Sequence, residues 1–318
     1  MPELPEVETI RRELERDILN QRISRVEVLA VKTIHGKAVD FIKQLTGNSI
    51  TGIERRGKLL IFSLKKGGHK LLVHLKMTGQ LVYKNTKKLV FGGHNISESD
   101  LVVPNRFTRI VFHFGKKTTL YFNDMRRFGF MKLVNESEVE QVVAKSYGVD
   151  ALSPDFTEKY LQTVLQKRAK TTIKAALLDQ KHLAGIGNIY ADEVCFATGI
   201  LPGRRVNSLS AVKIKEIHKV IKRVLSLAIK HGGTTFTSAR RSQAKPAYVL
   251  AGFGEAKEAQ SQFLAGHFVR SDGVKGNFTR YLKVFDRTGQ KCLRCKKGII
   301  QKTRVAGRGT HFCPKCQK

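Results

Sequence analysis

Acidic residues are scarce in this chain of 318 residues. It carries 26 aspartates and glutamates against 58 lysines and arginines, a formal net charge of +32. Solubility does not require such an excess, and like charges would repel one another in a compact protein unless a polyanion offset them. We therefore expect nucleic acid as the partner. Charge alone does not separate an enzyme from a ribosomal or chromatin-type binding protein.

Long apolar runs are also missing. No segment approaches the length that crosses a bilayer, and the N-terminus is acidic and helical in pattern, unlike a signal peptide. No long basic amphipathic helix stands out, which disfavours a membrane surface as the partner. We expect a cytoplasmic, nucleoid-associated protein, acting as a monomer, whose five cysteines form no disulfides.

Hydrophobic residues make up 41% of the chain, enough for packed cores. In residues 2–18, Val7, Ile10, Leu14 and Ile18 recur at helical spacing. Residues 22–134 hold short segments rich in β-formers and separated by glycines, which predicts an antiparallel sandwich or barrel. Residues 150–231 have helical patterns, the clearest at 208–233, where we expect Val212 within the apolar stripe.

Four cysteines gather at the C-terminal end. Cys292 and Cys295, then seventeen residues, then Cys313 and Cys316 match the spacing of a four-cysteine zinc site. Four protein ligands leave no open position, so one structural Zn²⁺ is expected. The alternative, a redox dithiol, needs only one such pair. The remaining Cys195 lies in an apolar helical stretch and is most simply a buried thiol.

Pro2 allows two interpretations. A proline is common in the first turn of a helix, and composition alone favours this structural role. Removal of Met1, however, would expose a secondary amine with a pKa near 8. Such an amine can attack a sugar C1′ and form an iminium, which acidifies the C2′ proton and permits β-elimination, with Glu3 nearby to move protons.

Several ordered motifs decide between these interpretations. They are MPELPEVETIRRELE (1–15), RRGKLLIF (55–62), HLKMTG (74–79), NDMRRFG (123–129), LLDQKHLAGIGNIYADEVCF (177–196), LPGR (201–204), HGGTT (231–235) and GRGTHFCPKCQK (307–318). Together the motifs closely resemble the bacterial formamidopyrimidine-DNA glycosylase family, the 8-oxoguanine DNA glycosylases with AP lyase activity. The resemblance covers nearly the whole chain except 237–266.

The resemblance implies an α+β fold: an N-terminal antiparallel β-sandwich with an N-terminal helix, a helical helix–two-turn–helix domain and a C-terminal zinc-ribbon β-hairpin. The expected parts are a catalytic domain (1–135), a linker (136–149), the helix–two-turn–helix domain (150–236), an extended lesion-recognition insert with its following segment (237–285) and the zinc finger (286–318).

The resemblance also implies roles for catalytic residues. Pro2 corresponds to the nucleophile and Schiff-base former, Glu3 to the proton shuttle, and Glu6 to a supporting carboxylate beside them. Lys58 resembles the family's lysine that contacts a phosphate next to the lesion. From pattern alone, Lys58 would be a solvated lysine at the end of a strand.

Further residues are implied to contact double-stranded damaged DNA. Met77, Arg126 and Phe128 resemble the trio that fills the hole left by the flipped nucleotide, although core packing is the simpler interpretation of Met77 and Phe128. The resemblance extends to four other expected DNA contacts, at Lys170, Asn188, Arg308 and Arg109. Relatives often carry histidine where this chain has Arg109, and a phosphate contact is still expected there.

The family implies a bifunctional glycosylase/AP lyase of base excision repair that acts on oxidised purines. Leu4 and the trio favour this branch over the related endonuclease VIII group, which acts on oxidised pyrimidines and remains one alternative. A catalytically silent zinc-ribbon DNA-binding protein is the other. The chain differs from its relatives in the insert 237–266, which they lack. Two interpretations of this insert stay open, an extended lid and a disordered tether.

Overall fold

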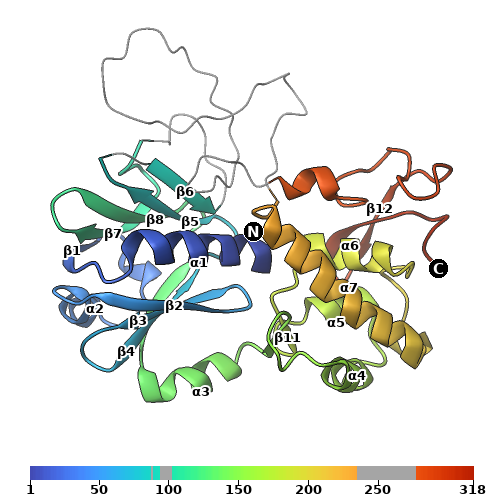
Figure 1. Ribbon diagram of the computed structural model, residues 1–318, viewed down its shortest axis with the longest axis horizontal. Helices are drawn as coiled ribbons and strands as arrows, with labels where there is room; N and C mark the ends of the chain where they lie inside the picture. Colours follow the sequence, from blue (N-terminus) through green and yellow to red (C-terminus); the bar gives the residue numbers. More distant parts are fainter. Residues whose placement is uncertain (87–88, 94–101, 235–276) are drawn as a thin grey trace, which may run out of the picture. The chain divides into compact units, whose positions relative to one another are not determined.

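The computed structural model of this protein (Figure 1) describes residues 1–86, 89–93, 102–234 and 277–318. These residues form two compact units. Unit 1 comprises residues 1–140 with 231–234 and 277–279, and unit 2 comprises residues 141–230 and 280–318. The insert 237–266, for which the sequence left a lid and a tether open, lies outside the described residues.

Two antiparallel sheets form the body of unit 1, as predicted for a sandwich (Figure 1). One sheet has the strand order β1-β7-β8-β5-β6 and the other β2-β3-β4-β9. The first contains β1 (Ile23–Val28), β5 (Gly79–Lys84), β6 (Leu89–Gly93), β7 (Thr108–Phe114) and β8 (Thr118–Asp124). The second contains β2 (Ile50–Arg56), β3 (Leu59–Leu64), β4 (His69–His74) and β9 (Phe130–Asn135).

Helix α1 (Leu4–Ile18) begins the chain and packs against the edge strands β2 and β6, one from each sheet. All four residues of its predicted apolar stripe are buried, and they join side chains of both sheets, such as Phe62 and Phe122, in one core. The remaining elements of unit 1 and its boundary are η1 (Val31–Thr33), α2 (Ala38–Leu45), η3 (Glu136–Glu138), α3 (Val139–Ala144) and η5 (Phe278–Tyr281). Because the apolar face of α1 packs against both sheets, the helix holds residues 1–3, which directly precede it, in a defined position.

Helices dominate unit 2. They are α4 (Glu158–Lys167), α5 (Ile173–Leu178), α6 (Asn188–Ala197), η4 (Val206–Ser208) and α7 (Ala211–Lys230), with a short parallel pair β10 (Val149–Asp150) and β11 (Leu183–Ala184). The expectation for Val212 is wrong, because this side chain is 77% exposed. The inward position belongs to Ile214, which shares a face with Ile217 and Ile221 at spacings of three and four residues, whereas Val212 points elsewhere.

A two-stranded hairpin ends unit 2. Strands β12 (Gln301–Val305) and β13 (Arg308–Phe312) pair in antiparallel register, and Val305 lies opposite Arg308. The two connecting residues, Ala306 and Gly307, both have positive φ, of 50° and 72°. This is the backbone of a type I′ turn, which suits a two-residue hairpin. Arg308 is exposed and directly follows this turn at the tip of the hairpin.

Candidate active site and DNA interface

The N-terminal residues are buried at the start of α1. Pro2, Glu3 and Glu6 are all buried, although Met1 is half-exposed. The Glu6 carboxylate accepts a hydrogen bond from the Glu3 backbone N–H at 2.9 Å, which caps the first turn of the helix. The proline in the first turn of the helix is Pro5, whereas Pro2 lies before the Glu3 N-cap and is buried there.

Glu6 also anchors a distant segment of unit 1. Its other carboxylate oxygen accepts the backbone N–H of Thr234 at 2.7 Å and the Thr234 hydroxyl at 2.9 Å. A Cβ on Gly233 would lie 2.8 Å from the same carboxylate oxygen, so this position needs glycine. Glu6 thus joins the start of α1 to Thr234 of the HGGTT motif, and its supporting role in catalysis stays a prediction.

Lys58 belongs to the same region and is buried, so the interpretation of a solvated strand-end lysine is wrong. Gly57, with a φ of +60°, turns the chain between β2 and β3 and places Lys58 directly before β3. Burial lowers the pKa of the N-terminal ammonium, while Glu3 and Glu6 raise it and Lys58 lowers it further. These charges act on one another because the four groups lie close together.

The depressed pKa matters for chemistry. An amine is nucleophilic only when it is neutral, and a lowered pKa increases the neutral fraction near pH 7. In the present chain this amine belongs to Met1, and removal of Met1 would expose the Pro2 nitrogen one residue along, still in the buried region near Glu3, Glu6 and Lys58. The site can therefore present a neutral secondary amine, a carboxylate within its reach and a lysine for an anionic group.

Met77, Arg126 and Phe128, which are expected to fill the space of the flipped nucleotide and are called the wedge residues below, come together on two turns of unit 1. The Met77 Sδ lies 3.5 Å from Nη1 of Arg126, and the Arg126 guanidinium lies 4.7 Å from the centre of the Phe128 ring. Met77 is 38% exposed and Phe128 is 51% exposed, so the interpretation of ordinary core packing is wrong for both. An exposed stack of a thioether, a guanidinium and a ring can enter a base stack.

Arg109 differs from its expectation as a residue facing DNA. It is buried, and it donates from Nε to the Asp124 carbonyl at 2.9 Å and from Nη1 to the Arg106 carbonyl at 3.1 Å. Burial lowers the pKa of this guanidinium, and the neighbouring Arg127 adds to the effect. The structure thus gives Arg109 a supporting role beneath the turn that carries Arg126, and its phosphate contact stays a prediction.

His74 is a residue that the sequence reasoning missed. Burial, aided by Lys76 and Lys58, lowers the pKa of His74 to about 3. The neutral ring accepts the backbone N–H of Lys76 at 2.9 Å through Nδ1, which shapes the turn before Met77. The HLKMTG motif contained this histidine, and only its neighbour Met77 was assigned a role.

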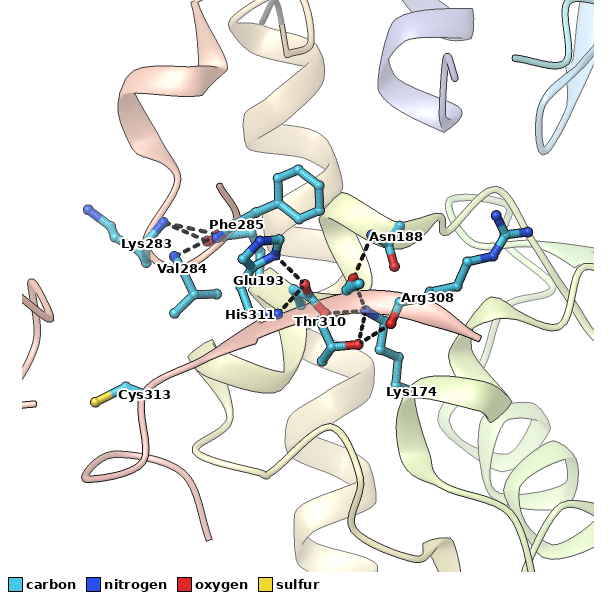
Figure 2. Close-up of polar contacts among 12 residues, drawn as sticks. Lys174, Asn188, Glu193, Lys283, Val284, Phe285, Arg308, Thr310, His311 and Cys313 are labelled. Atoms are coloured by element: carbon cyan, nitrogen blue, oxygen red, sulfur yellow. Dashed lines mark hydrogen bonds and ion pairs between the residues drawn. The ribbon is translucent and has the colours of Figure 1, made fainter. Parts of the chain in front are cut away.

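Two of the three predicted DNA contacts of unit 2, Asn188 and Arg308, meet at the hairpin. Asn188 is the first residue of α6 (Asn188–Ala197), and its Nδ2 donates to the Gly309 carbonyl at 2.9 Å. Arg308 is the residue before Gly309, and its side chain extends away from the bonded cluster (Figure 2). Lys170 is exposed before α5. The Gly309 carbonyl therefore fixes the side chain of Asn188 to the base of Arg308.

Two adjacent carboxylates of α6 hold the C-terminal segment (Figure 2). Asp192 accepts Lys174 Nζ at 2.6 Å and the His311 backbone N–H at 2.8 Å. Glu193 accepts the backbone N–H groups of residues 283, 284 and 285, each within about 3.0 Å. Sequence reasoning missed these anchors. The available signal was a pair of acids inside an apolar helix of a very basic chain.

The four tail cysteines form one cluster, and their sulfur atoms lie within 4.8 Å of one another. The sulfurs of Cys292 and Cys316 are 3.6 Å apart, and those of Cys295 and Cys313 are 3.8 Å apart. Zn–S bonds of about 2.3 Å in a tetrahedron place sulfurs about 3.8 Å apart, so the cluster fits Zn²⁺. Cys195 is buried elsewhere, where burial raises the pKa of its thiol, as expected for an inert core residue.

Among the described residues, no helix combines the length and the hydropathy that a bilayer-crossing segment requires.

Three family profiles match consecutive parts of the chain. The Formamidopyrimidine-DNA glycosylase N-terminal domain matches residues 1–131, the Formamidopyrimidine-DNA glycosylase H2TH domain matches 147–240, and the zinc finger found in FPG and IleRS matches 289–318. A formamidopyrimidine-DNA glycosylase from Carboxydothermus hydrogenoformans is 36% identical over 321 residues, covering 100% of both chains.

Solved structures of the Lactococcus lactis FPG are similar in fold over 100% of both chains. A mutant in complex with a Fapy-dG containing DNA has a TM-score of 0.78 at 34% identity. The wild-type protein in complex with an oxidized pyrimidine containing DNA has the same TM-score and identity. With profiles that match most of its length and a full-length relative above 30% identity, this chain belongs to the formamidopyrimidine-DNA glycosylase family.

Proposed function

We propose that this protein is a formamidopyrimidine-DNA glycosylase with AP lyase activity, which removes oxidised purines from duplex DNA in base excision repair. The buried start of α1 carries this proposal, because it brings together near the chain terminus the amine, the carboxylates and the lysine that the reaction needs, at Pro2, Glu3, Glu6 and Lys58. A silent DNA-binding protein would have no need of such a site. Under this proposal, residues 1–135 form the catalytic domain, and residues 237–285 contribute to recognition of the lesion.

The chemistry begins once Met1 has been removed. The Pro2 nitrogen attacks C1′, the glycosidic bond breaks, and the damaged base leaves with the bonding electron pair and takes up the proton that the amine loses. The C1′–O4′ bond of the sugar ring then breaks, O4′ takes a proton, and the nitrogen lone pair forms the double bond to C1′. The resulting iminium is positively charged and withdraws electrons from C2′. Glu3 accepts the C2′ proton, and the 3′ phosphate leaves in β-elimination. A second elimination expels the 5′ phosphate, and water then releases Pro2 from the sugar fragment.

The surrounding residues bind and deform the DNA. Lys58 neutralises a phosphate next to the lesion, while Met77, Arg126 and Phe128 occupy the space of the everted nucleotide. In unit 2, Lys170, Asn188 and Arg308 bind phosphates, which sets the register without reading sequence. Arg109 supports the wedge turn and adds positive charge nearby.

Zn²⁺ at Cys292, Cys295, Cys313 and Cys316 would be structural, because four thiolates fill a tetrahedral site. When bound, it crosslinks the two Cys-x-x-Cys segments that flank the hairpin. The residues of the hairpin, Arg308 foremost, make the contacts to DNA. We place the protein with chromosomal DNA in a bacterial cytoplasm, acting as a monomer.

Oxidised pyrimidines are a second candidate substrate class. The complex of the Lactococcus lactis FPG with an oxidized pyrimidine containing DNA supports this breadth. Release of base from duplexes with 8-oxoguanine, Fapy-dG or thymine glycol, compared at equal enzyme, tests the proposal. Faster release of the two purine lesions supports it. Release of thymine glycol alone, or of no base, would overturn it.

A further inference from the structure

The three wedge residues lie on two separate turns of unit 1. Met77 is in the turn between β4 and β5, which is closed by a hydrogen bond from the Gly79 N–H to the Leu75 carbonyl at 2.9 Å. Arg126 and Phe128 are in the turn between β8 and β9. Each turn contains a non-glycine residue with positive φ, Lys76 at 50° and Arg127 at 57°. Backbones of this kind persist only where the surroundings hold them.

A buried pair of side chains holds both turns together. Thr78 and Asp124 are 5% and 1% exposed, and the Thr78 hydroxyl donates to Oδ1 of Asp124. The Arg126 backbone N–H is shared between the Thr78 hydroxyl, at 3.0 Å, and the same carboxylate oxygen, at 3.2 Å. Residues of two different turns therefore meet at one backbone amide, that of the central wedge residue.

The second oxygen of Asp124 fixes the far end of the same turn. Oδ2 accepts the Gly129 N–H at 2.7 Å. A Cβ at residue 129 would lie 2.8 Å from the Phe122 ring and 3.0 Å from Oδ2, so the close approach requires glycine. The Asp124 carboxylate thus accepts hydrogen bonds from the main chain on both sides of Phe128. The residues that supply the accepting oxygens, Thr78 and Asp124, are both buried.

We propose that Thr78 and Asp124 are positioning residues that assemble the Met77–Arg126–Phe128 stack before DNA binds. The inference rests on the proposed function, since it concerns eversion of a damaged nucleotide. A stack that is already ordered loses less conformational entropy when it enters the duplex. Neither residue needs to touch DNA, because each acts through the backbone of the turns.

The test uses Thr78→Val, which keeps the shape and removes the hydroxyl, on the full-length zinc-loaded protein. Thr78→Ser keeps the hydroxyl. The matched control is Thr198→Val, which removes a buried hydroxyl bonded to the Val194 carbonyl at 2.9 Å in unit 2. Two rates are measured for each variant: single-turnover release of 8-oxoguanine, and borohydride trapping on a duplex with an abasic site, which has no base to unstack.

We expect Thr78→Val to slow release of 8-oxoguanine about tenfold, while trapping on abasic DNA changes less than about twofold. Unstacking, measured with 2-aminopurine beside the lesion, should slow in parallel. Thr78→Ser and Thr198→Val should match the wild type. In a Met77→Ala, Arg126→Ala, Phe128→Ala background, Thr78→Val should have no further effect, because its action passes through those three side chains.

Equal losses on both substrates, or an unchanged rate on 8-oxoguanine, would overturn the inference while leaving the proposed function standing. The same loss in the background without the Met77, Arg126 and Phe128 side chains would also overturn it. A wild-type protein that is trapped on neither substrate overturns the proposed function itself, and the inference with it. Asp124→Asn offers a second test, since its amide has one acceptor oxygen and would present its NH2 to either the Arg126 or the Gly129 N–H. We expect the same selective loss on 8-oxoguanine, and equal rates of wild type and variant on that substrate would overturn the inference.

Discussion

Lys174→Met tests how α6 holds the hairpin that carries Arg308. The Lys174 and Asp192 side chains are both 0% exposed, and Nζ uses all three of its hydrogens. It donates to Asp192 Oδ1 at 2.6 Å, to the Thr310 hydroxyl at 2.8 Å and to the Gly309 carbonyl at 3.1 Å. Methionine keeps most of the apolar stem of lysine and removes every one of these bonds.

The expected cost follows from the partner that is left behind. Without Lys174, the buried carboxylate of Asp192 keeps only its bonds to the backbone N–H and ring Nδ1 of His311. Removing one member of a buried ion pair costs about 3–5 kcal/mol, mostly because the other charge stays desolvated. We expect a loss in the free energy of unfolding of that size.

Urea unfolding of the zinc-loaded protein measures this loss, and DNA affinity is measured beside it. Lys215→Met is the matched control, because the Lys215–Glu158 pair is exposed and 4.0 Å apart, a geometry worth less than about 1 kcal/mol. The double variant Lys174→Met, Asp192→Asn should recover part of the stability, since it leaves no buried charge. A loss below about 1 kcal/mol in Lys174→Met would refute this account of the anchor.

Two further predictions concern acid stability and zinc. Burial raises the pKa of Glu8, but hydrogen bonds from Arg11 and Arg12 and the charge of Arg55 outweigh it and lower the pKa to about 2. Glu8→Gln should therefore cost on the order of 2 kcal/mol near pH 7, and the difference from wild type should vanish as the pH falls from about 4.5 towards 2; a difference that persists at pH 2 would contradict the assignment. Chelation of Zn²⁺ should make four of the five cysteines reactive to a thiol reagent, leave Cys195 protected, and weaken DNA binding at least about tenfold. Protection of all five after chelation would contradict a zinc-held tail.

Much of the fold could be predicted from local sequence patterns. The helix expected within residues 2–18 is Leu4–Ile18 in the structure, because the spacing of its apolar residues is a local signal. The zinc cluster could be predicted for the same reason, because the spacing of its four cysteines is visible in the sequence. Val212 was misplaced because apolar side chains at neighbouring helical positions do not show which of them faces the core.

Contacts between residues that are far apart in the chain could not be predicted from the sequence. Lys174 lies 18 residues from Asp192 and 136 from Thr310, so no local pattern pairs them. Burial of Lys58 and Arg109 likewise depends on how strands from different parts of the chain enclose them. The wedge trio was found through family motifs, whereas its contact geometry, with Arg126 between Met77 and Phe128, came only from the structure.

The most direct test of the central claim is the site of covalent attachment. The protein is incubated with a duplex that contains 8-oxoguanine, reduced with borohydride during turnover, digested and analysed by mass spectrometry. We predict a sugar adduct on the nitrogen of Pro2 in a chain that has lost Met1, and none in a chain whose N-terminus is extended. An adduct on Lys58 or another lysine, or no adduct from an enzyme that releases the base, would contradict the account.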